Sequence, residues 1–153
     1  EMSQPYEIVE VDAAGKISSF IGDKLAIIGR FCGLLDALPP RSKIYLFYTD
    51  DNGAVAAESL GMLKALLSDI KLRKAPELEI AGYTDTVGSE PDNDAESQRR
   101  AERFALKLAA EIEQAGIEAV STEVIGRGER SLLVATADEV AEARNRRIEV
   151  ILR

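Results

Sequence analysis

The sequence predicts an α/β fold, an α+β sandwich in which a mixed sheet packs against two long helices. Three observations support this class. Residues 44–48 are a continuous apolar run, which is typical of a strand buried on both faces. Two later segments place apolar side chains at the spacing of a helix that buries one face. Short apolar segments follow these helices, so the expected order along the chain is β-α-β-α-β-β.

Residues 1–40 are expected to form an N-terminal extension of one strand and one helix. Residues 6–11 alternate between apolar and polar side chains, as a short strand does, and a turn follows. A helix is predicted over residues 19–37, ahead of two consecutive prolines. Its apolar stripe consists of Ile21, Leu25, Ile28, Cys32 and Leu35. We expect the Cys32 thiol to be buried on this stripe as a small hydrophobe.

Residues 43–153 are expected to form the main domain. Beyond the first strand, the predicted elements are a helix over 54–73, a strand over 78–82, a helix from 94 to Gly116, and strands over 120–125 and 147–152. The two crossovers imply that the strands they join are parallel neighbours. The last connection is short enough to permit an antiparallel final strand.

Composition excludes several function classes. The net charge of −8 argues against nucleic acid and against anionic lipid as partners, because both need clustered Lys and Arg. The chain has no histidine, which rules out a Ser-His-Asp or Cys-His catalytic site. We expect no metal and no cofactor. No apolar run is long enough to span a bilayer. Residues 1–5 are polar, so no signal peptide is expected here. Because the chain starts at Glu1, we expect it to be a piece of a longer protein.

The most informative stretch covers residues 82–101. Asp85 follows the predicted strand over 78–82, and Arg100 lies in the helix that comes next. Asn93 is expected to cap this helix, with Glu96 completing a capping box. If both charges reach one pocket, Asp85 accepts from an ammonium and Arg100 donates to a carboxylate. The alternative is a salt bridge between Asp85 and Arg100 that pins the loop to the helix.

Several spaced motifs in this region resemble the OmpA-like peptidoglycan-binding domain family. That family includes the periplasmic domain of outer membrane protein A, the peptidoglycan-associated lipoprotein and the flagellar stator B subunit. The resemblance covers roughly residues 43–153. The motifs that carry it are Gly82-Tyr-Thr-Asp85, Gly88, Asn93, Ser97, Arg100-Ala101, Gly126-Arg-Gly128-Glu129 and Asn145-Arg-Arg-Ile-Glu149.

The resemblance implies noncatalytic binding of peptidoglycan through the diaminopimelate of its stem peptide, in the periplasm, by a domain that anchors a larger envelope protein. By position, it assigns the grip on diaminopimelate to Asp85 and Arg100. Around the ligand it places Thr84, Asn93, Arg147 and the loop of residues 49–52.

One residue departs from the pattern. Glu96 stands where the family has leucine, and it either completes the capping box or alters or abolishes ligand binding. A second function therefore stays open, in which the fold has lost its ligand and serves as a protein–protein interaction domain. The basic run of Arg144, Arg146 and Arg147 suits local ion pairs or a share in ligand binding, mainly by Arg147. An enzyme is not expected, because no pair of carboxylates stands out from the acidic loop.

Overall fold

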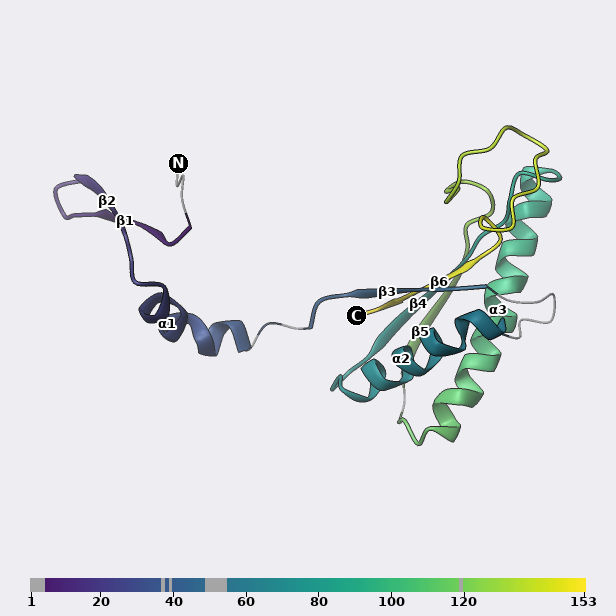
Figure 1. The fold of residues 1–153 in the computed structure, drawn as a ribbon, viewed down its shortest axis with the longest axis horizontal. Helices are drawn as coiled ribbons and strands as arrows, with labels where there is room; N and C mark the ends of the chain where they lie inside the picture. The colour runs from purple at the N-terminus through teal and green to yellow at the C-terminus, as the bar shows by residue number, and fades with distance from the viewer. Residues whose placement is uncertain (1–4, 37, 39, 49–54, 119) are drawn as a thin grey trace. The chain divides into compact units, whose positions relative to one another are not determined.

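The chain divides into two structural units, Glu1–Pro39 and Pro40–Arg153 (Figure 1). The structure is a computed structural model, and it describes residues 5–36, 38, 40–48, 55–118 and 120–153. Within these residues, no helix has both the length and the apolar character needed to cross a bilayer.

The first unit is a β-hairpin followed by one helix. Strands β1 (Glu7–Val11) and β2 (Ile17–Ile21) pair antiparallel. In the turn between them, the Asp12 carboxylate accepts hydrogen bonds from two backbone amides at 2.9 Å. Helix α1 spans Lys24–Asp36. The predicted helix start at residue 19 is therefore wrong, because the chain up to Ile21 pairs with β1 instead.

The predicted burial of Cys32 is also wrong. Its thiol is exposed and donates a hydrogen bond to the carbonyl of Gly29 at 3.2 Å. The reason is that the apolar stripe of α1 remains uncovered, with Leu25 at 77% and Ile28 at 39% exposure. Helical spacing of apolar residues predicts a face that can be buried, but it does not supply the surface that buries it.

The second unit contains a four-stranded mixed sheet in the order β3-β6-β4-β5. Its strands are β3 (Lys43–Phe47), β4 (Glu77–Gly82), β5 (Ser121–Gly126) and β6 (Ile148–Leu152). Strands β4 and β5 are parallel, and β6 is antiparallel to both β3 and β4. The predicted mixed sheet is confirmed. Parallel neighbours are confirmed only for β4 and β5, because β6 lies between β3 and β4.

Strand β3 is an edge strand, which corrects its predicted burial on both faces. Among the described strands it pairs with β6 alone. Tyr45 and Phe47 face the core, whereas Ile44 is 67% exposed. A continuous apolar run does not by itself separate a central strand from an edge strand with one covered face.

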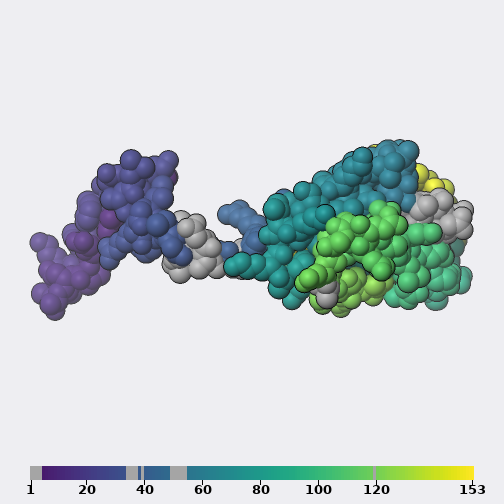
Figure 2. Space-filling view, turned by 90° about the horizontal axis from the view of Figure 1, so that it is seen from below, coloured from purple at the N-terminus to yellow at the C-terminus, as the bar shows by residue number. Residues whose placement is uncertain are grey.

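Two helices cover the core face of this sheet, as predicted. Helix α2 (Leu60–Lys71) follows a short 3-10 helix, η1 (Ala57–Ser59), and α3 spans Glu90–Gln114. Figure 2 shows the outer surfaces of α2 (teal) and α3 (green) next to each other. The largest fully buried apolar side chains of this core are Phe47, Leu66, Ile70, Ile80, Phe104, Ile148, Val150 and Leu152. The Phe47 and Phe104 rings join sheet and helix at 5.0 Å between centroids.

Two glycines let α3 approach the ends of β4 and β5 closely. Gly82 and Gly126 are register partners across these strands. A Cβ on Gly82 would collide with the carbonyl oxygen of Ser97, and one on Gly126 would lie 2.7 Å from the amide nitrogen of Gln98. This contact brings the middle of α3, including Arg100, beside the exit of β4.

Candidate functional site

Helix α3 begins earlier than the sequence suggests. Its N-cap is Ser89, whose hydroxyl accepts from the Asp92 amide at 3.3 Å and donates to the Asp92 carboxylate at 2.6 Å. Pro91 lies in the first turn, where its missing N–H costs nothing. The prediction that Asn93 caps the helix is therefore wrong, because Ser89 offers a complete cap one turn before it. Arg100 consequently lies about three turns into the helix.

Asn93 and Ser97 instead attach α3 to the turn that follows β5. Both side chains are buried. Asn93 donates to the Glu129 carboxylate at 2.6 Å, and the Ser97 hydroxyl accepts from the Gly128 amide at 2.9 Å. These bonds hold the start of the helix against the end of the sheet. Asn93 thus holds the first turns of α3 in place through Glu129.

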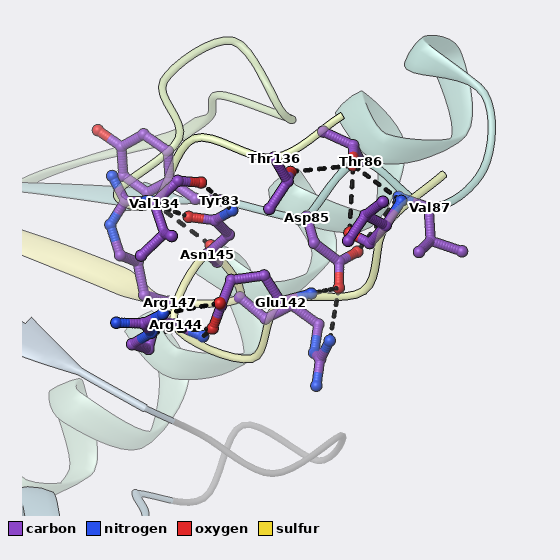
Figure 3. Close-up of polar contacts among 12 residues, drawn as sticks. Tyr83, Asp85, Thr86, Val87, Val134, Thr136, Glu142, Arg144, Asn145 and Arg147 are labelled. Carbon is purple, nitrogen blue, oxygen red and sulfur yellow. Dashed lines mark hydrogen bonds and ion pairs between the residues drawn. The ribbon is translucent and has the colours of Figure 1, made fainter. Parts of the chain in front are cut away.

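Asp85 lies just past the end of β4 and is 5% exposed. Its carboxylate accepts from the Glu142 amide at 3.2 Å and, more weakly, from the Val87 amide at 3.4 Å (Figure 3). The ion pair it forms is with Arg146, at 2.5 Å. The alternative prediction of a salt bridge between Asp85 and Arg100 is therefore wrong, because Asp85 pairs with Arg146 and Arg100 pairs with Glu96. Backbone donors on two segments hold this carboxylate in one orientation.

Arg100 is nearly buried, with 12% of its side chain exposed. One terminal nitrogen donates to the Tyr83 carbonyl at 2.6 Å, and the other lies 3.4 Å from Glu96. Burial lowers the pKa of the Arg100 guanidinium, Glu96 opposes that shift, and the charge on Arg146 adds to it. Asp85 raises the same pKa, so the charges of Asp85, Arg100 and Arg146 act on one another in one region.

Glu96 takes no part in a capping box. Its carboxylate lies 3.0 Å from Arg103, 3.3 Å from Arg99 and 3.4 Å from Arg100. The predicted box fails because Asn93 is already inside the helix. Glu96 is the acidic centre of a basic stretch of α3, and it adjoins the residue expected to hold a ligand carboxylate.

The basic run before β6 divides into separate ion pairs. Arg146 pairs with Asp85, and Arg144 pairs with Glu142 through two bonds of 3.0 and 2.9 Å. The Arg144 guanidinium and its backbone amide lower the pKa of Glu142 to about 2. The interpretation of this run as local ion pairs is confirmed for both residues.

Arg147 is 4% exposed and is held inside the domain. Its guanidinium lies 3.8 Å from the Tyr83 ring centroid, pairs with Glu149 at 2.8 Å and donates to the Ser131 carbonyl at 3.1 Å. Burial raises the pKa of Tyr83, with the Glu149 charge acting in the same direction. These contacts favour a structural role for Arg147. Its predicted contact with a ligand stays a prediction.

A cavity of about 440 Å³ lies beside Arg100, Arg144 and Arg146. Three arginines and one glutamate contribute to its lining, so it is basic within an acidic protein. The predicted wall at residues 49–52 lies outside the described residues. A larger cavity of about 700 Å³ lies between α3 and β5 and is lined mainly by apolar side chains. The smaller, basic cavity is lined by Tyr48, Ala56, Glu58, Arg100, Ala143, Arg144 and Arg146.

Thr84 is buried beside Asp85, and its hydroxyl oxygen has no hydrogen-bond partner among the described residues. Its backbone amide donates to the Gly128 carbonyl at 3.0 Å. Within the described part of the chain, no group of three or more Asp, Glu or Cys side chains is arranged to hold a metal ion. The chemistry of this region is therefore that of fixed charges and hydrogen-bond donors around a small cavity.

The sequence singled out Asp85 and Arg100 but not Arg146, the ion-pair partner of Asp85. The run containing Arg144, Arg146 and Arg147 was visible. Which of these side chains faces Asp85 depends on where β6 begins and on the path of the preceding turn. Neither is encoded in the local pattern.

Comparisons with known proteins agree on one family. The model described as the OmpA family matches residues 47–146. A peptidoglycan-associated lipoprotein of Legionella pneumophila is 32% identical over 112 residues, which are 73% of this chain and 61% of that protein. Outer membrane porin F of Pseudomonas fluorescens is 32% identical over 99 residues, 65% of this chain and 29% of the porin. The chain thus spans less than two thirds of either relative's length.

The fold agrees as well. The crystal structure of the peptidoglycan-associated lipoprotein from Burkholderia pseudomallei matches with a TM-score of 0.58 at 24% sequence identity. The match covers 71% of this chain and 90% of that one. The family match runs from the end of β3 to Arg146 and so includes Asp85 and Arg100. The chain therefore belongs to the OmpA family.

Proposed function

We propose that this domain binds peptidoglycan without catalysing a reaction, by gripping the diaminopimelate of the stem peptide. One observation carries the proposal: the nearly buried donor Arg100 lines a basic cavity together with Arg146, and Arg146 pairs with the buried acceptor Asp85. A diaminopimelate end offers an ammonium and a carboxylate on one carbon. The name of the Legionella relative, a peptidoglycan-associated lipoprotein, supports the same ligand class.

Binding in this site is an exchange of partners. In the free domain Asp85 pairs with Arg146, and Arg100 contacts Glu96. The ligand ammonium replaces Arg146 at Asp85, and the ligand carboxylate accepts from Arg100 and from the released Arg146. Each charge-assisted bond contributes about 1.5–3 kcal/mol before the cost of the exchange. The Glu142 amide keeps the Asp85 carboxylate oriented throughout.

Supporting groups lie around this grip. The unpartnered Thr84 hydroxyl is available to a polar group of the ligand. Asn93 holds the helix start in position through Glu129. Arg147 is left out of the proposed contacts, since its guanidinium is held between the Tyr83 ring and Glu149.

The proposed setting is the periplasm, where the domain anchors a larger envelope protein to the cell wall. Two relatives are named as a lipoprotein and an outer membrane porin, which supports an envelope location. The net charge of −8 gives no basis for nucleic acid or anionic lipid as a partner. Protein partners in the envelope remain compatible with this role.

A second candidate function rests on the internal pairing itself. Glu96 contacts Arg100, and Arg146 contacts Asp85. The two residues proposed to bind the ligand carboxylate and ammonium are therefore already paired within the domain. A domain that had lost its ligand and served only protein–protein contacts would keep these pairs unbroken.

Calorimetric titration with a diaminopimelate-containing muropeptide separates the two functions. We expect binding that weakens as salt is added and that is lost in Asp85→Ala and Arg100→Ala. Asp85→Asn retains the shape of the side chain and should weaken binding without unfolding the domain. Glu113→Gln, at the far end of α3, is the control with unchanged binding. No binding by the wild type would refute the proposal. Binding by the Asp85 and Arg100 variants as strong as that of the wild type would refute it as well.

A further inference from the structure

Glu96 places a negative charge next to the group that is to receive the ligand carboxylate. Of its three arginine partners, Arg100 is the most distant and Arg103 the nearest. Arg100 can therefore turn one nitrogen toward a ligand while Glu96 keeps its other two partners. The charge of Glu96 stays in place when a ligand binds.

We propose that Glu96 makes this site discriminate against a free carboxylate and in favour of the corresponding carboxamide at the diaminopimelate end of the ligand. The inference rests on the proposed function, because it concerns the ligand group that Arg100 meets. It assigns Glu96 the role of a specificity-determining residue.

The physical reason lies in charge and in hydrogen-bond complementarity. A carboxylate at Arg100 brings a second negative charge into the neighbourhood of Glu96. A carboxamide brings no charge, and its carbonyl oxygen still accepts a hydrogen bond from Arg100. Arg100 is nearly buried, so solvent screens this repulsion less than it would at an exposed position.

The size of the effect follows from Coulomb's law. A ligand carboxylate placed about 7 Å from Glu96, at an effective dielectric of about 40 that allows for Arg99 and Arg103 nearby, is repelled enough to change affinity by about fivefold to tenfold. This factor applies to the carboxylate ligand and not to its neutral amide. The measurable quantity is therefore the ratio of the two affinities.

A purely positioning role predicts a different result. If Glu96 only holds Arg100 in its rotamer, loss of the Glu96 charge weakens the acid and the amide by the same factor. The affinity ratio then stays constant while both affinities fall. The ratio separates specificity from support in a way that a single affinity cannot.

The test titrates a diaminopimelate muropeptide and its amidated form into the wild type, Glu96→Gln and Glu113→Gln. Glu96→Gln retains the side-chain shape and removes the charge. Glu113→Gln makes the same charge change about 25 Å farther along α3 and is the matched control. We expect the acid-to-amide affinity ratio to rise about fivefold to tenfold in Glu96→Gln and to stay unchanged in Glu113→Gln. Glu96→Leu serves as a second variant, and thermal unfolding verifies that each one is folded.

The outcomes are distinct. An unchanged ratio in both Glu96 variants, with clear wild-type binding, overturns this inference and leaves the proposed function standing. Parallel losses for both ligands overturn it in favour of a positioning role. Absence of binding by both ligands to all variants refutes the proposed function together with this inference.

Discussion

The adjacent residues Arg146 and Arg147 are expected to respond in opposite ways to the same substitution. The Arg147 side chain is 4% exposed and makes three hydrogen bonds as well as its contact with the Tyr83 ring. Arg147→Gln leaves Glu149 with the Tyr83 hydroxyl, 3.3 Å away, as its remaining described partner. Breaking a buried pair of this kind costs about 3 kcal/mol, which lowers the melting temperature by roughly 10 °C.

Arg146→Gln should cost far less stability. The Arg146 side chain is 42% exposed, and Asp85 retains backbone donors when its ion pair is lost. An ion pair this exposed contributes about 1 kcal/mol or less. The same change removes a proposed contact to the ligand carboxylate, so muropeptide affinity should fall about tenfold. Arg147→Gln should leave the affinity of the folded fraction within about twofold of the wild type.

Thermal and urea unfolding, paired with muropeptide titration, measure both effects on the same samples. Arg144→Gln is the matched control for stability, since the Arg144 side chain is 61% exposed whereas that of Arg147 is 4% exposed. An Arg147→Gln variant as stable as the wild type would refute the assignment of Arg147 to the interior. A larger loss of stability in Arg146→Gln than in Arg147→Gln would refute the assigned roles of both residues.

Three further predictions follow from the packing and the titrating groups. Burial and the hydrogen bond to Asp69 raise the pKa of Tyr45 to about 12, so its stabilising contribution is complete below pH 10.0 and is lost as pH rises through about 12. Absorbance titration of tyrosinate should show this late transition, and an undiminished amplitude near pH 12 in Tyr45→Phe would contradict the assignment. The pKa of the Glu142 carboxyl is lowered from 4.5 to about 2. Its charged form should therefore stabilise the fold above pH 4.5, and this stabilisation is lost as pH falls through about 2. In Arg144→Gln, NMR titration should find the Glu142 pKa closer to 4.5, and an unchanged Glu142 pKa would count against the ion pair. Phe104→Ala should cost about 3–5 kcal/mol in urea unfolding, against about 1–2 for Phe104→Leu, and equal losses would contradict the ring contact with Phe47.

Local patterns predicted the elements of the second unit well. Strand β4 follows from a short apolar run, and the core-facing residues of α3 follow from helical spacing. Both patterns are visible within a short stretch of sequence. The predicted start of α3 was wrong because two residues that can cap a helix, Ser89 and Asn93, lie within five residues of each other. Ser89 forms the cap with Asp92, which places Asn93 inside the helix.

The first unit shows the limits of the same reasoning. The apolar residues Ile17, Phe20 and Ile21 suit either a helix or a strand, and pairing with β1 decided between them. Ile21, the first residue of the predicted apolar stripe, lies in β2, and Cys32 in α1 is exposed. Whether an amphipathic face is buried depends on another surface, and that information is not local.

The sequence by itself determined the class of fold, the family motifs and the pair of charges formed by Asp85 and Arg100. These depend on residue type and short-range spacing. Only the tertiary structure decided that β6 lies between β3 and β4, that Arg146 pairs with Asp85, and that Arg147 is enclosed. The physical reason is that strand order and register join segments far apart in the chain. A shift of one residue in the start of β6 would exchange the directions in which Arg146 and Arg147 point.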